Sequence, residues 1–167
     1  MKKELIILRA MELEDAAFIY DLFQIPMYQP IFHEEKTSLE TWKTRCLTMI
    51  QSPRSYDYII HDPDINSDIG YVGLYQPSDE HEIELQVVVL DPDYCGQGVG
   101  TTVVDLLKQK FTDLKHDKMT VKTLAKNFKL KHFYAKNLFY EMGDEFIEEI
   151  DSDSFETYVK MECELKS

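Results

Sequence analysis

The chain has 167 residues, which is enough for one domain with a single hydrophobic core and leaves little room for a second. Its hydrophobic fraction of 44% and aromatic fraction of 12% exclude an intrinsically disordered chain. The net charge of −13 argues against nucleic acid as a partner, because an acidic surface repels phosphates. An acidic surface attracts cations such as amines, and it also aids solubility.

The N-terminal third of the chain predicts one strand and two helices. Residues 5–9 form a short apolar run that indicates a strand, and residues 13–23 place apolar side chains at helical intervals. Ser38 is a favourable N-cap for a second helix at residues 39–50, which Pro53 ends.

Two short β-rich runs, residues 56–61 and 69–75, flank a segment with the composition of a turn, residues 62–68. That segment superficially resembles a calcium loop. The sixth position is Ser67 where the loop needs Gly, and the twelfth is Gly73 where it needs Glu. We therefore expect a β-hairpin here and no metal site anywhere in the chain.

Residues 82–90 carry the strongest strand pattern, first alternating and then continuing as Val-Val-Val-Leu, which is typical of a central strand covered on both faces. The remaining chain predicts a helix at 101–111, a strand at 119–124, a helix at 130–139 and two strands at 146–150 and 155–163. This order predicts a mixed α/β fold with one parallel crossover near its middle.

A glycine-rich turn with Gly96, Gly98 and Gly100 joins the central strand to the helix that follows. Glycine permits unusual backbone angles and close approach of a ligand, and the N–H groups at a helix start attract anions. A Walker loop is excluded because no lysine follows Gly100, and a dinucleotide fingerprint is excluded because residue 101 is Thr. The alternative is a turn that only starts a helix.

The segment Cys95-Gly96-Gln97-Gly98-Val99-Gly100 resembles the pyrophosphate motif of GNAT acetyltransferases, in which Arg or Gln is followed by two residues, Gly, one residue, and Gly or Ala. It matches at Gly98 and Gly100, whereas Cys95 stands where Arg or Gln is usual.

The resemblance extends over nearly the whole chain. Leu8-Arg9 followed by Asp15 is similar to the family's first strand and helix start. Asn127, Tyr134 and Phe139 are similar to its late segment, with Leu138 in place of a glycine, so we expect the turn after that helix to differ.

This resemblance implies a single GNAT domain over residues 1–167. The implied fold is an α/β (α+β mixed) structure with a central, mostly antiparallel sheet of about seven strands, a splayed parallel strand pair, and helices on both faces. It also implies acetyl-CoA as co-substrate, held by the backbone of the central strand, by the turn and by one asparagine. These cofactor-binding residues are Val88, Val89, Leu90, Cys95, Gly96, Gln97, Gly98, Val99, Gly100, Thr101 and Asn127.

The resemblance further implies direct attack by an amine on the thioester, with Tyr134 as the acid that protonates the leaving thiolate. Glu82 and Glu84 lie on one strand face and are both candidates for the base, with Glu82 matching the family's position better and His81 as an outside candidate. The alternatives are a core tyrosine, solvated carboxylates, and a helix cap at Asn127.

The expected activity is N-acetylation of a primary amine on a small molecule or a protein or peptide N-terminus, with Tyr28, Phe32 and Trp42 walling the acceptor pocket. The alternative is a non-catalytic acyl-CoA-binding or regulatory domain, which Cys95 and Leu138 favour.

Three cysteines, an odd number without a metal-type pair, indicate reduced thiols. No apolar run has the length of a signal or membrane segment, so a cytoplasmic protein is expected, without nucleic acid or membrane partners, and a homodimer is common among relatives.

Overall fold

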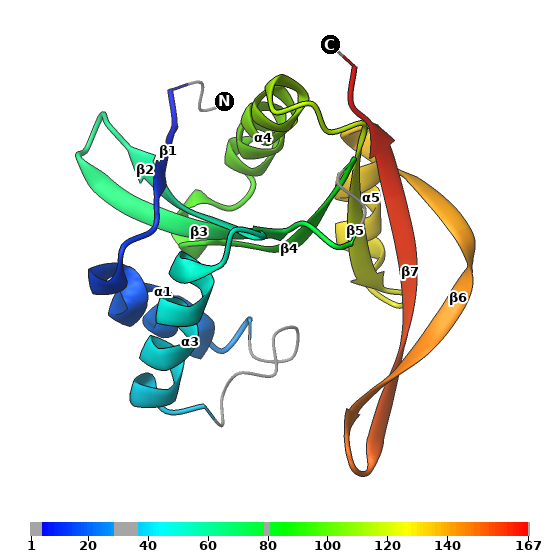
Figure 1. The fold of residues 1–167 in the computed structure, drawn as a ribbon, viewed down its shortest axis with the longest axis horizontal. Helices are drawn as coiled ribbons and strands as arrows, with labels where there is room; N and C mark the ends of the chain where they lie inside the picture. The colour runs from blue at the N-terminus through cyan, green and yellow to red at the C-terminus, as the bar shows by residue number, and fades with distance from the viewer. Residues whose placement is uncertain (1–4, 29–36, 79–80, 167) are drawn as a thin grey trace. The chain divides into compact units, whose positions relative to one another are not determined.

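The computed structural model describes residues 5–28, 37–78 and 81–166, and within them all side chains except that of Asp151. The chain falls into two compact units (Figure 1). The first comprises Met1–Tyr75 and Val87–Val103, and the second comprises Gln76–Gln86 and Val104–Ser167. The described strands form one mixed sheet in the order β1-β2-β3-β4-β5-β7-β6, which confirms the predicted α/β class.

An antiparallel meander forms the sheet of the first unit. Strands β1 (Ile7–Ala10), β2 (Ser55–Asp62) and β3 (Ser67–Tyr75) pair in succession, and β3 is followed in the sheet by β4 (Glu82–Leu90), whose second half belongs to this unit. The turn between β2 and β3 confirms the predicted hairpin.

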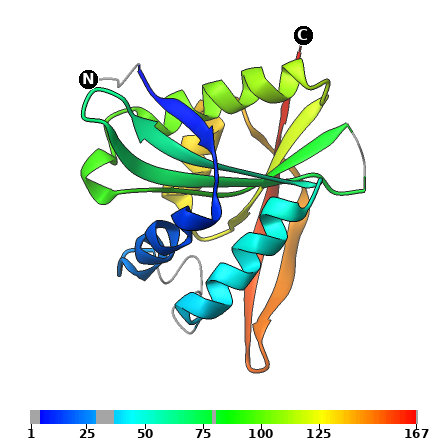
Figure 2. The same cartoon turned by 60° about the vertical axis from the view of Figure 1, so that its left-hand side comes forward.

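Two helices cover one face of this meander. They are α1 (Ala16–Gln24), preceded by the 3-10 turn η1 (Leu13–Asp15), and α3 (Leu39–Gln51), and they lie side by side (Figures 1 and 2). The side chain of Ser38 accepts the N–H of Thr41 at 3.1 Å, as its N-cap position predicts. The buried core beneath these helices consists of Met11, Ala16, Ile19, Leu22, Phe23, Tyr28, Trp42, Cys46, Ile59, Tyr71 and Val89.

The second unit contains the parallel pair. β4 pairs with β5 (Lys118–Leu124) over four residues only, from Glu82↔Lys118 to Leu85↔Val121. β5 then pairs with β7 (Ser154–Glu164), and β7 pairs with β6 (Tyr140–Asp151) in a long antiparallel hairpin (Figure 2). The helices are α5 (Phe128–Lys136) and the later turns of α4 (Val99–Asp113).

The end of α5 differs from the prediction, which extended this helix to residue 139. The helix stops at Lys136 because Leu138 adopts φ +71°, a left-handed angle that ends helices and that glycine favours. The side chain of Leu138 is 74% exposed, so nothing crowds it in this conformation. The turn therefore keeps the backbone geometry that a glycine would supply, contrary to the expectation that it would depart from it.

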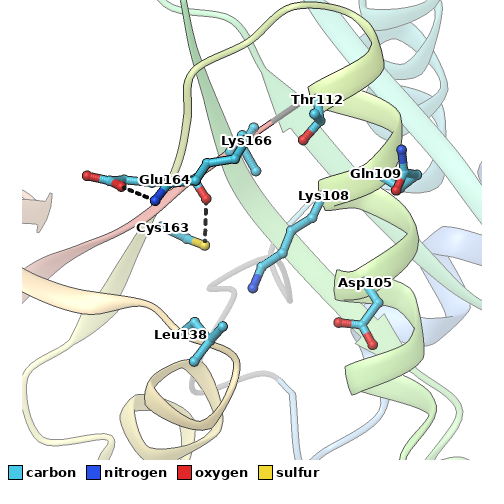
Figure 3. Close-up of a pocket in the computed structure, with 9 residues that line it drawn as sticks. Asp105, Lys108, Gln109, Thr112, Leu138, Cys163, Glu164 and Lys166 are labelled. Carbon is cyan, nitrogen blue, oxygen red and sulfur yellow. Dashed lines mark hydrogen bonds and ion pairs between the residues drawn. The ribbon is translucent and has the colours of Figure 1, made fainter.

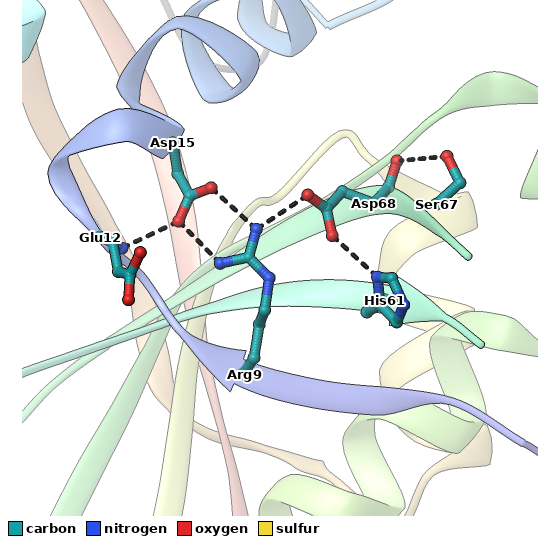
Figure 4. Close-up of polar contacts among 6 residues, drawn as sticks. All are labelled: Arg9, Glu12, Asp15, His61, Ser67 and Asp68. Carbon is teal, nitrogen blue, oxygen red and sulfur yellow. Dashed lines mark hydrogen bonds and ion pairs between the residues drawn. The ribbon is translucent and has the colours of Figure 1, made fainter.

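A partly buried cluster of ion pairs links β1 to neighbouring elements of the first unit (Figure 4). The guanidinium of Arg9 donates to both oxygens of Asp15, at 2.8 and 2.9 Å, and to Asp68 at 2.8 Å. Burial alone would raise the pKa values of Asp15 and Asp68. The hydrogen bonds and charge of Arg9, with the N–H of Glu12 at Asp15 and with His61 at Asp68, outweigh burial and hold both pKa values below the ordinary range.

None of the helices within the described ranges is long and apolar enough to cross a membrane.

Candidate active site

The glycine-rich turn leaves β4 and reaches α4 within the first unit. The side chain of Asp91 accepts the N–H of Asp93 at 3.0 Å and starts a short 3-10 turn, η2 (Pro92–Tyr94). Gly96 and Gly98 then take φ of +77° and +81°, the left-handed region that other residues enter only at a cost. A Cβ atom added to Gly96 would meet nothing within 4 Å, so the space beside this backbone is open.

The first turn of α4 provides a site for an anion. The helix begins at Val99, two residues before the predicted start, so Gly100 is helical rather than left-handed. Thr102 donates its N–H to the carbonyl of Gly98 at 3.1 Å, which is the first bond of the helix. The N–H groups of Val99 and Gly100 therefore have no acceptor within the helix, and they lie at the positive end of its dipole.

The end of β4 has backbone groups that point in alternating directions. Asp91 donates its N–H to the carbonyl of Ile69 in β3 at 2.7 Å, so alternation along the strand turns Val89 towards β3 as well. The same alternation turns the backbone of Val88 and Leu90 away from β3. Of the three residues expected to pair with a pantetheine arm, Val88 and Leu90 therefore direct their backbone groups away from β3 and Val89 directs its groups towards it.

Tyr28 connects the region after α1 to this strand end. Its hydroxyl donates a hydrogen bond to the carbonyl of Leu90 and lies 3.7 Å from the sulfur of Cys95. Burial, the largest effect, and the neighbouring Cys95 raise the pKa of Tyr28. Trp42, also expected to wall the acceptor pocket, is a core residue packed edge-on against Phe23, and Phe32 lies outside the described residues.

In the second unit, Tyr134 lies on the buried face of α5. It is only 6% exposed, and the rings of Phe133 and Phe139 pack edge-on against it, each with its centroid 5.3 Å away. Burial raises the pKa of Tyr134, so the phenol keeps its proton at neutral pH. A protonated phenol is what a general acid requires, and the same burial would equally suit a core residue.

The two candidate bases have different surroundings. Glu82 is 14% exposed, and its two oxygens lie 3.9 Å from the Nζ atom of Lys118 and 3.4 Å from that of Lys160, from strands β5 and β7. Glu84, part-buried on the same strand, makes no ion pair with any residue that the structure describes. His81 forms a surface pair with Asp117 at 3.2 Å. Both oxygens of Glu82 are thus engaged by lysines, whereas the carboxylate of Glu84 stays available to an acceptor amine, so this geometry favours Glu84 over Glu82.

Asn127 is the N-cap of α5, because its side-chain oxygen accepts the N–H of Leu130 at 3.0 Å. The cap uses the oxygen and leaves the side-chain NH₂ group to donate to a ligand. The capping interpretation and the cofactor-binding interpretation of Asn127 are therefore compatible.

Comparison with known proteins identifies the family. The model of the acetyltransferase (GNAT) domain matches residues 6–139, which is most of the chain. This chain belongs to the GNAT acetyltransferase family. No curated protein matches the sequence at a significant level.

Solved structures share the GNAT fold over nearly the full length. Spermidine N-acetyltransferase from Vibrio cholerae, in complex with CoA and spermine, is 22% identical with a TM-score of 0.84, over 98% of this chain and 97% of that chain. A chimera of the spermidine N-acetyltransferase from Vibrio cholerae and hSSAT is 23% identical with a TM-score of 0.82, over 96% and 95%. An acetyltransferase from Thermus thermophilus is 17% identical with a TM-score of 0.79, over 99% and 100%.

The family assignment confirms the resemblance to GNAT acetyltransferases that was based on the glycine-rich turn, and with it the prediction of an N-acetyltransferase. The non-catalytic alternative is not favoured. One of the two features that supported it, Leu138, still gives the turn the left-handed angle of a glycine.

A pocket of about 290 Å³ in the second unit contains none of the predicted site residues (Figure 3). Both of its lysines have partners: Lys108 donates to the carbonyl of Asn137 at the end of α5, and the Nζ atom of Lys166 lies 3.7 Å from a carboxylate oxygen of Glu164. The lining residues are Asp105, Lys108, Gln109, Thr112, Leu138, Cys163, Glu164, Leu165 and Lys166. Because both lysines have partners within the chain and none of the predicted site residues lines this pocket, we do not assign acetyl transfer to it.

The described residues contain no group of three or more His, Cys, Asp or Glu side chains that could hold a metal.

The sequence did not predict one polar group of the first unit, a hydrogen-bonded pair formed by Asp57 of β2 and Tyr71 of β3. The two residues are 14 positions apart, and only the register of the hairpin brings them together.

Proposed function

We propose that the chain is a single GNAT domain that transfers the acetyl group of acetyl-CoA to a primary amine of a polyamine. The observation that carries this proposal is the turn after β4. There, two left-handed glycines and the unbonded N–H groups of Val99 and Gly100 form an anion site in a chain that the family model identifies as an acetyltransferase.

The cofactor side of the proposed site uses backbone groups. The N–H groups from Gly98 to Gly100 bind the pyrophosphate, with open space beside Gly96 for its approach. Cys95 can replace the usual Arg or Gln because these contacts come from the main chain. The outward-facing backbone groups of Val88 and Leu90 pair with the pantetheine arm as an additional strand would, and Asn127 donates its NH₂ group to the same arm.

The chemical step is direct transfer between two substrates. The ammonium group of the acceptor loses one proton to Glu84, and the freed nitrogen lone pair forms a bond to the thioester carbon. The carbon–sulfur bond then breaks and the leaving sulfur takes the proton of Tyr134, while the nitrogen gives its second proton, through water, to the Tyr134 phenolate and so restores the phenol. The raised pKa of the Tyr134 phenol keeps that proton available until negative charge develops on sulfur. Glu84 suits the base role because no cation of the described chain ties up its carboxylate.

The acceptor class is supported by charge and by similarity. A net charge of −13 attracts polycations, and the similar solved structures include enzymes named for spermidine. Electrostatic attraction of this kind is long-ranged and is screened by salt, so it favours capture of the amine rather than its exact placement.

The test is to incubate the protein with acetyl-CoA and a panel of spermidine, spermine, an amino acid amide, a peptide with a free N-terminus and an aminoglycoside, and to follow release of the CoA thiol. We expect turnover with spermidine and spermine well above the others. Turnover with the peptide alone would overturn the polyamine assignment. Binding of acetyl-CoA without turnover on any amine would support the binding-only alternative.

A further inference from the structure

The last residue of β4, Leu90, has a backbone carbonyl that needs a partner from outside the sheet. This carbonyl points away from β3, because the N–H of the next residue, Asp91, is bonded to β3. On the side away from β3, β4 pairs with β5 only as far as Leu85, so the described part of the sheet offers Leu90 no partner strand. Leu90 is buried, and a buried carbonyl without a hydrogen bond is costly.

The hydroxyl of Tyr28 supplies this partner. It donates a hydrogen bond to the carbonyl of Leu90, 62 positions later in the chain, and the side chain of Tyr28 is buried. Burial, and then the neighbouring Cys95, raise the pKa of Tyr28, so the phenol keeps its single proton at neutral pH. The hydroxyl is therefore a permanent donor to the end of β4.

Cys95 extends this contact to the glycine-rich turn. Its sulfur lies 3.7 Å from the hydroxyl oxygen of Tyr28. Because the phenol proton is donated to Leu90, the thiol is the donor in this second contact and the oxygen of Tyr28 is the acceptor. Leu90 and Cys95 lie on either side of η2, so one side chain bonds both ends of the segment that joins β4 to the glycine-rich turn.

The local sequence explains how Tyr28 is held at this point. Helix α1 ends at Gln24, shortly before Pro26, which lacks the N–H that a helix requires. The N–H of Tyr28 then donates to the carbonyl of Ile25 at 2.9 Å and closes a turn. The ring of Tyr28 belongs to the same buried core as Val89 of β4. Packing therefore fixes the ring, and the hydrogen bond to Leu90 fixes its hydroxyl.

The two groups that Tyr28 bonds belong to the proposed cofactor site. The backbone of Leu90 is assigned to the pantetheine arm, and Cys95 leads into the turn whose N–H groups are assigned to the pyrophosphate. A ligand that contacts both places needs a fixed spacing between them, and a spacing set in advance reduces the entropy lost on binding. The carbonyl of Leu90 has a second lone pair, so it can accept from Tyr28 and from the arm together.

We propose that Tyr28 is a positioning residue for acetyl-CoA, whose hydroxyl holds the end of β4 and the glycine-rich turn at the spacing that the cofactor requires. The inference rests on the proposed function. Tyr28 takes no part in acetyl transfer itself, and this role on the cofactor side is separate from the role in the acceptor pocket that the sequence predicted.

The test is calorimetry with acetyl-CoA on the wild type, Tyr28→Phe and Tyr71→Phe. Tyr71 is the matched control, because it lies in the same buried core and its hydroxyl also donates a hydrogen bond, to Asp57 at 2.6 Å, outside the cofactor site. Tyr28→Phe should weaken binding by about tenfold, as expected for the loss of one hydrogen bond, and Tyr71→Phe should leave it within about twofold. Equal affinity in the wild type and Tyr28→Phe, tighter binding by Tyr28→Phe, or an equal loss in both variants overturns the proposal.

Alkylation of Cys95 gives a second readout that needs no cofactor. Cys95 is exposed, whereas Cys46 and Cys163 are buried, so iodoacetamide should label Cys95 in the folded protein. Labelling, followed by mass spectrometry, should be severalfold faster in Tyr28→Phe, where the thiol has lost its acceptor, and unchanged in Tyr71→Phe. An unchanged rate in Tyr28→Phe overturns the link between Tyr28 and the turn. A wild type that binds no acetyl-CoA overturns the proposed function and this inference with it, whereas equal binding by the wild type and Tyr28→Phe overturns this inference alone.

Two synthetic residues keep the test decisive if Tyr28→Phe does not fold. Replacement of Tyr28 by 4-aminophenylalanine or by 4-fluorophenylalanine keeps the ring and fills the place of the hydroxyl. The amino group can donate to the carbonyl of Leu90 and the fluorine atom cannot. We expect affinity for acetyl-CoA close to that of the wild type with the amino group, and about tenfold weaker with fluorine. Equal affinities in the two proteins overturn the proposal.

Discussion

Replacement of Tyr134 by Phe separates chemistry from binding in this GNAT enzyme. The change removes one hydroxyl group and leaves the ring between Phe133 and Phe139, each with its centroid 5.3 Å away. Packing should therefore be retained, and the free energy of unfolding should change by no more than about 1 kcal/mol. If the hydroxyl protonates the leaving thiolate, kcat should fall by about 100-fold, which corresponds to about 2.7 kcal/mol of transition-state stabilisation.

The assay is steady-state release of the CoA thiol, with kcat and the KM for acetyl-CoA determined separately. We expect a lower kcat and an unchanged KM for acetyl-CoA. Tyr140→Phe is the matched control, because Tyr140 is 46% exposed on β6 and the same atom is removed; its kcat should stay within about twofold of the wild type. An unchanged kcat in Tyr134→Phe would refute the acid assignment. A raised KM with unchanged kcat would show that the hydroxyl anchors the cofactor instead.

Three further predictions concern the turns and the ion cluster. Leu138→Gly should raise the free energy of unfolding by about 1 kcal/mol, or the melting temperature by about 2–4 °C, because glycine adopts this left-handed backbone angle without strain and the replaced side chain is exposed. An unchanged or lower melting temperature would contradict this. Gly98→Asp should abolish acetyl-CoA binding in calorimetry while the protein still melts cooperatively, and unchanged affinity would refute the pyrophosphate assignment. Because Arg9 lowers the pKa values of Asp15 and Asp68, their stabilising contribution is present above pH of about 4 and is lost as pH falls through the lowered values. The difference in urea midpoint between wild type and Arg9→Met should therefore shrink progressively as pH falls below about 4, and a constant difference would contradict this coupling.

The order of helices and strands could be predicted from the sequence because local signals set it. Ser38 starts α3, and the apolar run of β4 marks a central strand. Element ends were predicted less well, because they depend on single backbone angles. The early end of α5 follows from the positive φ of Leu138, which no propensity for leucine would indicate.

The candidate site was predictable where it lies within one short segment, as at the glycine-rich turn. Contacts between distant strands were not predictable. Glu82 resembled the family's base in position, yet lysines from β5 and β7 surround it, and these pairings depend on strand order. The same holds for Asp57, whose partner Tyr71 is fixed by hairpin register.

Mass analysis of the acceptor tests most directly whether this chain acetylates an amine with acetyl-CoA. After incubation of wild type, Gly98→Asp and a protein-free control with acetyl-CoA and spermidine, we expect spermidine bearing one added acetyl group, formed with equimolar CoA, in the wild-type sample alone. Unmodified spermidine with intact acetyl-CoA in the wild-type sample, or equal product in the Gly98→Asp sample, would contradict it.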